Sequence, residues 1–257
     1  MFSAAGFAKT WEYIDLFKQG LVCTISLSFL TVMFGFILAL VLAIMRLSNF
    51  CPFRALGLTK DGRLREPGLL TVLAKFNPLD FIATAYVEIL RSTPVMVQIF
   101  VIYYVVLGNV DLPSFKLFGM IRFDRFFPGV VALSMNSGAY LCEIIRAGIQ
   151  SIDGGQTEAA RSLGLNPTQT MRHIILPQAF KAVLPSLANE FIVLLKETSV
   201  ASFVSVADLT YAGNIIGGNS YDYLFPLLMT AMIYLAMVMF FSYLVSKLER
   251  RLRNSER

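Results

Sequence analysis

Long apolar runs alternate with polar connections along this chain. The runs 21–45 and 223–246 contain no charged residue. As α-helices that rise about 1.5 Å per residue, both are longer than the roughly 30 Å hydrocarbon core of a bilayer. Three further runs, at about 82–107, 128–149 and 182–206, are mainly apolar but include charged residues. The pattern predicts an all-α integral membrane protein with five transmembrane helices in a single domain.

The composition agrees with this prediction. Of the 257 residues, 56% are hydrophobic, and the mean hydropathy of +0.65 is too high for a soluble core of this size. Cys23, Cys51 and Cys142 lack CxxC spacing, so the sequence indicates neither a disulfide framework nor a zinc site. The chain does not open with a basic leader, a short apolar core and a small-residue cleavage site, so we expect the first run to be an uncleaved anchor.

Positive charges are distributed unevenly between the connections. Of the 22 Lys and Arg residues, 15 follow the first, third and fifth runs, whereas five precede the first run or follow the second. Arg91 and Lys196 lie within runs. Because connections rich in Lys and Arg stay in the cytoplasm, we expect the N-terminus outside and the C-terminus in the cytoplasm. The net charge of +5 then reflects topology and requires no nucleic-acid partner.

Two cytoplasmic connections follow from this orientation. The first, 46–81, is interrupted by Pro52, Pro67 and Pro78, and nothing in its residues indicates a function. The second, 153–181, is a polar insert between the third and fourth runs.

The first half of the insert has clear helix signals. A turn at 153–155 precedes good helix formers, and Gly164 ends the helix because glycine readily takes the left-handed conformation. Small or apolar residues share one side of this helix: Ala159, Ala160 and Leu163.

A second helix is predicted to follow at once. Asn166 is a good N-cap and Pro167 a good first helical residue. Pro177 and Pro185 are expected to mark a kink and the entry to the next run. The insert is therefore predicted to be two short helices set at an angle and held close to the membrane.

An ordered motif runs through these two helices. Its fixed positions are Glu158, Ala159, Ala160, Gly164, Ile174, Leu176 and Pro177. This spacing resembles the EAA loop of permease subunits in bacterial ATP-binding cassette (ABC) importers. The segments 88–100, 137–152 and 194–209 are similar to the polar amino acid uptake branch of that superfamily, which carries substrates such as His, Glu, Gln, Arg and opines. The resemblance covers most of 85–209, and the long 49–80 connection departs from the compact form expected there.

The resemblance implies the five-helix, MetI-like core of a type I importer permease in the bacterial cytoplasmic membrane. It implies a second permease subunit, two cytoplasmic ATPase subunits, an extracytoplasmic solute-binding protein and a polar amino acid substrate. It favours neither a homodimer nor a heterodimer. It also implies that the EAA loop is the coupling helix seated on the ATPase, with these residues: Glu158, Ala159, Ala160, Leu163, Gly164, Ile174, Leu176 and Pro177.

The energy source must then lie outside this chain. The sequence has no GxxxxGK[ST] loop, which would supply the backbone cradle and the lysine that hold ATP phosphates. We expect ATP and Mg²⁺ on the partner ATPase subunits, and no cofactor, metal or catalytic residue in this chain. Our hypothesis is that closure of the ATPases pulls the coupling helices together and rocks the spans between outward-open and inward-open states.

Charged residues inside the runs point to a polar path. Each costs about 2.5–3.5 kcal/mol at the centre of a membrane helix, so each should face protein or water. The spacing pairs Glu88 with Arg91 and Glu143 with Arg146, and it places Glu190 and Glu197 on one face. The candidate path residues are Glu88, Arg91, Thr93, Asn136, Tyr140, Glu143, Glu190, Lys196 and Glu197. They suit a solute with both ammonium and carboxylate groups, although pairs of this kind also simply lock helices together. Thr93 precedes Pro94, which should break the second span as a hinge or a ligand contact.

Three other functions compete with an ABC permease. A transporter that is passive or driven by an ion gradient leaves the EAA motif unexplained, and no inverted repeat is evident. An intramembrane enzyme is disfavoured because His173, the only histidine, lies in the polar insert and no HExxH or GxSxG motif occurs. A receptor that docks a partner without moving solute is the third alternative.

Overall fold

The computed structural model describes residues 10–48, 50–52, 68 and 73–254. Most of the 46–81 connection, whose role the sequence left open, therefore lies outside the described residues. The elements in chain order are α2 (Ile14–Leu47), α4 (Pro78–Ser92), α5 (Val95–Phe100), a π-helix (Val101–Val106), β1 (Lys116–Leu117), β2 (Ile121–Arg122), α6 (Phe123–Gln150), α7 (Gly154–Ser162), α8 (Pro167–Thr170), a π-helix (Met171–Ile175), α9 (Leu176–Glu197), a 3-10 helix (Thr198–Val204), α10 (Leu209–Ser220) and α11 (Leu224–Asn254). The fold is almost wholly helical, as predicted, apart from a two-residue antiparallel hairpin that pairs Lys116 with Arg122 and Leu117 with Ile121.

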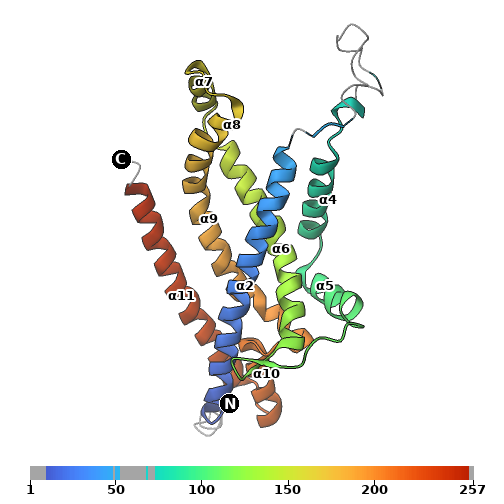
Figure 1. Ribbon diagram of the computed structural model, residues 1–257. Helices are drawn as coiled ribbons and strands as arrows, with labels where there is room; N and C mark the ends of the chain where they lie inside the picture. The colour runs from blue at the N-terminus through green and yellow to red at the C-terminus, as the bar shows by residue number, and fades with distance from the viewer. Residues whose placement is uncertain (1–9, 49, 53–67, 69–72, 255–257) are drawn as a thin grey trace.

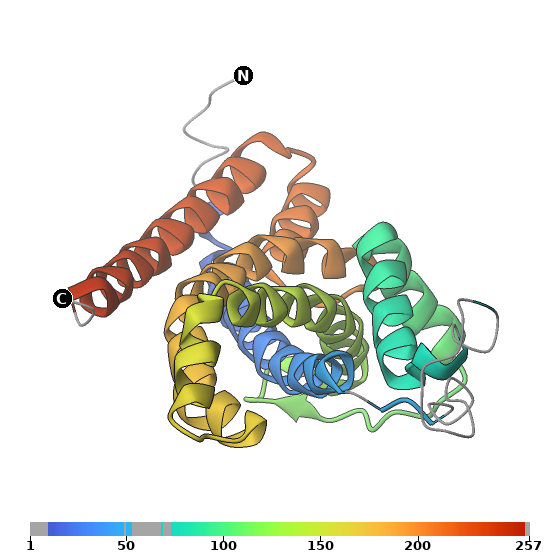
Figure 2. The ribbon, with the colours of Figure 1, turned by 90° about the horizontal axis from the view of Figure 1, so that it is seen from above.

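The long helices run side by side between two ends of the molecule (Figure 1). One end, which we call the loop end, carries α7, α8, the end of α2 and the start of α4. The other, the hairpin end, carries the start of α2, the β1–β2 hairpin and α10. Seen along the helices, α6 lies among α2, α4, α5 and α9, and it packs against all four (Figure 2). α11 lies apart from α6 and packs on α9 and α10.

Three helical stretches in the described part of the chain are long and apolar enough to cross a membrane: 14–47, 167–204 and 224–252. The pair formed by α4 and the helix that follows it, 95–106, qualifies as a fourth but is bent by 108°. α6 has the length of a span, yet it is not apolar enough to qualify alone. Its polar residues are tolerated because four neighbouring helices pack against it, so hydropathy alone does not identify it as a central helix of the fold. The fifth crossing and the orientation of the chain stay predictions.

Small residues bring α2 and α6 close together. A Cβ atom added to Gly35 of α2 would lie 3.2 Å from Ser137 Oγ and 3.3 Å from the Ser134 carbonyl. One added to Gly138 of α6 would lie 2.9 Å from Leu38 Cδ2. Helices in membranes associate through such small-residue contacts because lipid offers no hydrophobic driving force. This seam fixes the central pair on which the other helices pack.

The hairpin end holds α10 against both α2 and α11. Asp208 caps α10 by accepting hydrogen bonds from Tyr211 N (2.8 Å) and the Tyr234 hydroxyl (3.2 Å). The Leu209 amide donates to Thr24 Oγ1 of α2 at 3.1 Å. A Cβ atom on Gly20 would lie only 2.8 Å from the Asp208 carbonyl oxygen, so α2 has a glycine where the α10 backbone crosses it.

Candidate functional site

The loop end begins with a short, well-capped helix. Asp153 caps α7, and its carboxylate accepts a hydrogen bond from Gly155 N at 2.6 Å. The helix ends in a Schellman motif, in which Gly164 N donates to the Arg161 carbonyl (3.0 Å) and Leu165 N donates to the Ala160 carbonyl (3.1 Å). Gly164 has φ +83°, so the predicted glycine stop is confirmed. The helix starts at Gly154, slightly before the position that the sequence suggested.

A capping box starts the second helix, as the Asn166–Pro167 signal predicted. Asn166 Oδ1 accepts from Gln169 N and Gln169 Oε1 accepts from Asn166 N, both at 2.9 Å. The helix then fails to stop. It continues through a π-helical segment into α9 and on to residue 204.

The prediction of two short helices is therefore wrong for the second one, which is the start of the fourth span. Pro177 is the second residue of α9 and directly follows the π-helical segment of the same continuous helix. The π-helical segment before it shifts the hydrogen-bond pattern from i+4 to i+5. Pro185 lies inside α9 without ending it.

The residues of the motif point in different directions. Glu158 and Ala159 are exposed and Leu163 is 82% exposed, whereas Ala160 is buried. The prediction that Ala159, Ala160 and Leu163 share one side is therefore wrong for Ala160, whose face packs toward the following π-helical segment. α7 thus keeps one small residue for internal packing and presents an apolar and an acidic side chain outward.

The other end of the motif lies beside the long helices. Ile174 is half-buried, and Leu176 and Pro177 line an apolar pocket of about 380 Å³ with Phe36 and Ile149.

One side chain links the two halves of the loop. Gln178 Nε2 donates to the Ile174 carbonyl at 2.9 Å and lies 3.3 Å from Gln156 Oε1 of α7. The angle between α7 and the next helix is therefore held by the Gly164 turn at one point and by Gln178 at another.

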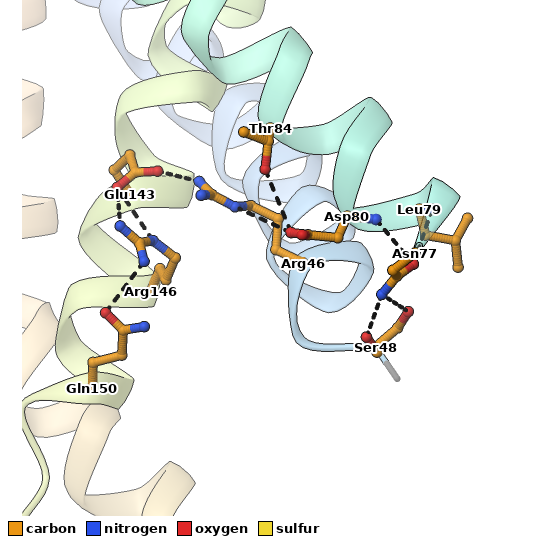
Figure 3. Close-up of polar contacts among 9 residues, drawn as sticks. All are labelled: Arg46, Ser48, Asn77, Leu79, Asp80, Thr84, Glu143, Arg146 and Gln150. Atoms are coloured by element: carbon orange, nitrogen blue, oxygen red, sulfur yellow. Dashed lines mark hydrogen bonds and ion pairs between the residues drawn. The ribbon is translucent and has the colours of Figure 1, made fainter. Parts of the chain in front are cut away.

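Four charged residues form a cluster near the loop end (Figure 3). Glu143 of α6 accepts hydrogen bonds from Arg46 of α2 and from Arg146, whose Nη2 lies 3.1 Å from Glu143 Oε2. Arg46 Nε also lies 3.9 Å from Asp80 Oδ1 of α4. Arg46 and Glu143 are mostly buried, at 12% and 20% side-chain exposure. The predicted Glu143–Arg146 pair is confirmed, and the cluster joins three helices.

Sequence reasoning missed two members of this cluster, Arg46 and Asp80. Both lie next to apolar runs; Arg46 entered only the count of basic residues in the connections, and Asp80 was not considered. Asn77 strengthens the same junction, since its side chain caps α4 and donates to the Ser48 carbonyl at 2.6 Å (Figure 3). A charged residue at each end of the 46–81 connection was the available signal.

A second polar group sits at the bend between α4 and α5. Pro94 has no amide to donate, and Gln98 supplies donors instead: its Nε2 lies 2.7 Å from the Leu90 carbonyl and 3.0 Å from the Thr93 carbonyl. Asn136 of α6 donates to Gln98 Oε1 at 3.0 Å. The predicted break at Pro94 is confirmed, and Gln98, which sequence reasoning missed, supports it. The only sequence signal for Gln98 was an amide inside an apolar run.

The proposed Glu88–Arg91 pair does not form in the described structure. The Arg91 guanidinium instead lies over the ring of Tyr140, 5.3 Å from its centroid, as a cation–π contact. Glu88, Arg91 and Tyr140 are all exposed. They form a small polar surface shared by α4 and α6.

The remaining path candidates lie on α9. Glu190 and Glu197 are half-buried and lie two helical turns apart on α9. Lys196 is exposed. Neither acid has a salt bridge to a residue in the described part of the chain. The nine path candidates thus divide into separate groups, and of the three on α6, which are Asn136, Tyr140 and Glu143, only Tyr140 is exposed.

Comparison with known proteins gives a consistent assignment. A family model described as "Binding-protein-dependent transport system inner membrane component" matches residues 68–254. The arginine transport system permease protein ArtQ of Bacillus subtilis (strain 168) is 32% identical over 250 residues, which cover 97% of this chain and 98% of that protein. The L-cystine transport system permease protein TcyB of the same organism is 34% identical and covers 96% and 93% of the two chains.

Solved structures show the same architecture. A crystal structure described as an amino acid ABC transporter with histidines has a chain 38% identical to this one, with a TM-score of 0.79 and coverage of 98% and 100%. An inward-facing structure of the MetNI methionine ABC transporter matches with a TM-score of 0.66 at 19% identity and 93% and 97% coverage, so it supports the fold alone.

Proposed function

Because this chain belongs to the binding-protein-dependent transport system inner membrane component family and is an ABC importer permease subunit, we propose that it carries a polar amino acid across the bacterial inner membrane. It does so as one of two permease subunits, together with two ATPase subunits and an extracytoplasmic solute-binding protein. ATP and Mg²⁺ are bound by the ATPase subunits. In this arrangement the loop end faces the cytoplasm, which agrees with the distribution of Lys and Arg.

The exposed face of α7 is the main observation that supports this proposal. Leu163 is a large apolar side chain at 82% exposure at the capped end of this helix, and a partner docked there would bury it. Glu158, also exposed on α7, has a carboxylate with no hydrogen bond or salt bridge within the described part of the chain, which leaves it available for a basic side chain of a partner. We assign this surface to the ATPase.

Movement of α7 would pass directly into the membrane helices. α6 ends at Gln150 and α7 begins at Gly154, so three residues separate them. The cluster around Glu143 lies within two turns of the end of α6 and connects it to α2 and α4 (Figure 3). At its other end, α4 is held to α5 and α6 through Gln98 and Asn136. We infer that α4 and α6 move together when the ATPases close.

The structure also separates supporting residues from candidates for solute contact. Glu143, Asn136 and Thr93 are engaged in contacts that hold helices together, so we assign them to support. Glu88, Arg91 and Tyr140 are exposed, and an arginine beside an acid suits a carboxylate and an ammonium group of one solute. Glu190, Lys196 and Glu197 on α9 are the remaining candidates. We propose that a second permease subunit completes the path.

Reconstitution tests the proposal. The chain would be inserted into vesicles with its ATPase and solute-binding protein, and ATP hydrolysis and amino acid accumulation would be measured together. Glu158→Ala and Gly164→Pro should lower both while membrane insertion stays normal, and Gly154→Ala provides a control in the same loop. Uptake should survive an ionophore and stop without the ATPase. The opposite pair of results would refute an ATP-driven importer and support a transporter driven by an ion gradient.

A further inference from the structure

Three basic side chains gather in one pocket at the hairpin end. Lys116, Arg122 and Arg125 line a pocket of about 190 Å³ together with Tyr211 and Ser205. The pocket lies where the β1–β2 hairpin meets the start of α6 and the first turn of α10. The connections predicted to lie on this side of the membrane carry only five Lys and Arg residues, so three of them in one pocket is a concentration of positive charge.

Most of this charge is left unneutralised by the protein. Arg122 pairs with Asp124, through Nε to Oδ1 at 3.2 Å and Nη2 to Oδ2 at 2.7 Å. The guanidinium bonded to it holds the pKa of Asp124 below its usual value, so the carboxyl is ionised. Lys116 and Arg125 form no salt bridge with any residue in the described ranges. With one acid against three bases, the pocket has a net charge of +2.

Exposed aromatic side chains surround the hairpin end. Phe118 at the hairpin turn is 74% exposed, and Phe115 is 49% exposed. Tyr221 and Tyr223, which join α10 to α11, are 95% and 52% exposed. Aromatic residues gather at both boundaries between a bilayer and water. Tyr221 and Tyr223, of a residue type enriched at that boundary, support placing the pocket at the level of lipid headgroups.

An apolar groove adjoins the basic pocket. It has a volume of about 530 Å³, runs between α2 and α6, and is lined by Phe34, Phe127 and Val131 among others. Phe126 contributes to both cavities, and Leu117 of the hairpin faces the groove while Lys116 faces the pocket. A positively charged pocket beside a long apolar groove matches the two parts of an anionic phospholipid.

We propose that the pocket binds the phosphate of an anionic phospholipid, whose acyl chain lies in the groove between α2 and α6. Lys116, Arg122 and Arg125 neutralise the phosphate, and the Tyr211 hydroxyl is placed to donate to it. Because the net charge of the site is +2, a lipid whose headgroup adds no cation is preferred over a zwitterionic one. Such a lipid would fix the hairpin to the start of α6, the central helix of the fold.

Lipid retention by the purified complex of permease and ATPase subunits tests this site without any transport measurement. The delipidated complex would be titrated with phosphatidylglycerol or with phosphatidylcholine, and bound lipid would be counted by native mass spectrometry. Lys116→Gln should weaken phosphatidylglycerol binding about fivefold, and a triple Lys116→Gln, Arg122→Gln, Arg125→Gln variant by well over tenfold. Lys18→Gln is the control, because this exposed lysine of α2 pairs with Asp15 outside the pocket.

A second arm separates a lipid from a free anion. Val131→Trp fills the groove and leaves the basic residues untouched, so it should weaken the binding of phosphatidylglycerol while having no effect on inorganic phosphate. Equal retention of phosphatidylglycerol by the parent, the triple variant and Val131→Trp would overturn the proposal. So would displacement of the lipid by millimolar inorganic phosphate, or a triple variant that keeps its lipid but loses stimulation by the solute-binding protein. That last result would assign the pocket to an acidic protein surface.

Discussion

Substitution of Gly164 isolates the contribution of one backbone turn to coupling. Gly164 has φ +83°, and an added Cβ would meet nothing within 4 Å. A side chain there therefore costs conformational strain alone, with no clash. For a residue with a Cβ atom the left-handed conformation costs roughly 1–2 kcal/mol, and a β-branched residue pays more. Strain of this size increases the population of the open turn about 5- to 30-fold, and an open turn no longer fixes the angle of α7.

The assay is ATP hydrolysis by the reconstituted complex, measured with and without the solute-binding protein, alongside amino acid uptake. We expect Gly164→Ala to lower stimulated hydrolysis and uptake several-fold, Gly164→Val to lower them further, and Gly164→Asn to be nearly silent because asparagine tolerates this conformation. Gly154 is the matched control: it lies in the first turn of α7 with equally open space around it and without a positive φ. Gly154→Ala and Gly154→Val should change neither activity.

The order of the effects among the Gly164 variants distinguishes backbone strain from steric obstruction. Uptake and stimulation in Gly164→Val equal to those of the parent would show that the angle of α7 does not matter for coupling. Equal losses in Gly164→Asn and Gly164→Val would mean that any side chain obstructs the ATPase, so contact and not backbone strain would be responsible.

Three further substitutions test the contacts that hold the helices. Gln98→Leu removes the donors to the carbonyls at the bend and one of the two hydrogen-bond acceptors of Asn136, so we expect stability to fall by about 1–3 kcal/mol, seen as a lower midpoint of thermal unfolding in detergent; an unchanged midpoint would mean that the bend stands without this side chain. Arg46→Gln should lower stability by about 1.5–3 kcal/mol and reduce coupling, and combining it with Glu143→Gln should recover part of both; additive losses would contradict a direct pair. Gly20→Ala places a methyl group 2.8 Å from a backbone oxygen of α10, so it should destabilise the protein by about 1–3 kcal/mol, whereas Gly154→Ala should be neutral; a silent Gly20→Ala would show that α10 is free to shift.

Local signals predicted local structure well. The apolar runs, the glycine stop at Gly164, the cap at Asn166 and the break at Pro94 each depend on residues within a few positions, and each is present in the structure. These features follow from the length of an apolar run, from the φ angles that glycine allows and from the backbone amide that proline lacks. None of them requires knowledge of what lies across the fold.

Contacts between residues far apart in the chain could not be predicted from such local signals. Arg46 and Glu143 are 97 residues apart, and either residue alone is compatible with a connection charge or a path residue. Glu88 lies at the spacing that favours an ion pair with Arg91, yet the Arg91 guanidinium contacts the ring of Tyr140 on another helix. The sequence predicts a kink at Pro177, whereas in the structure this proline directly follows a π-helical segment that no local sequence pattern indicates.

The least apolar of the long helices is also the one best placed to transmit force. α6 is buried among α2, α4, α5 and α9, so its polar residues meet protein partners where a lipid-facing helix would pay for them (Figure 2). It starts at the hairpin, passes Asn136 at the bend of α4 and Glu143 at the ion cluster, and ends three residues before α7. A helix enclosed in this way cannot tilt without moving its neighbours. A movement of α7 would therefore be transmitted to the bend at Pro94 through these contacts. An α6 made only of apolar residues would lack the side chains that form them.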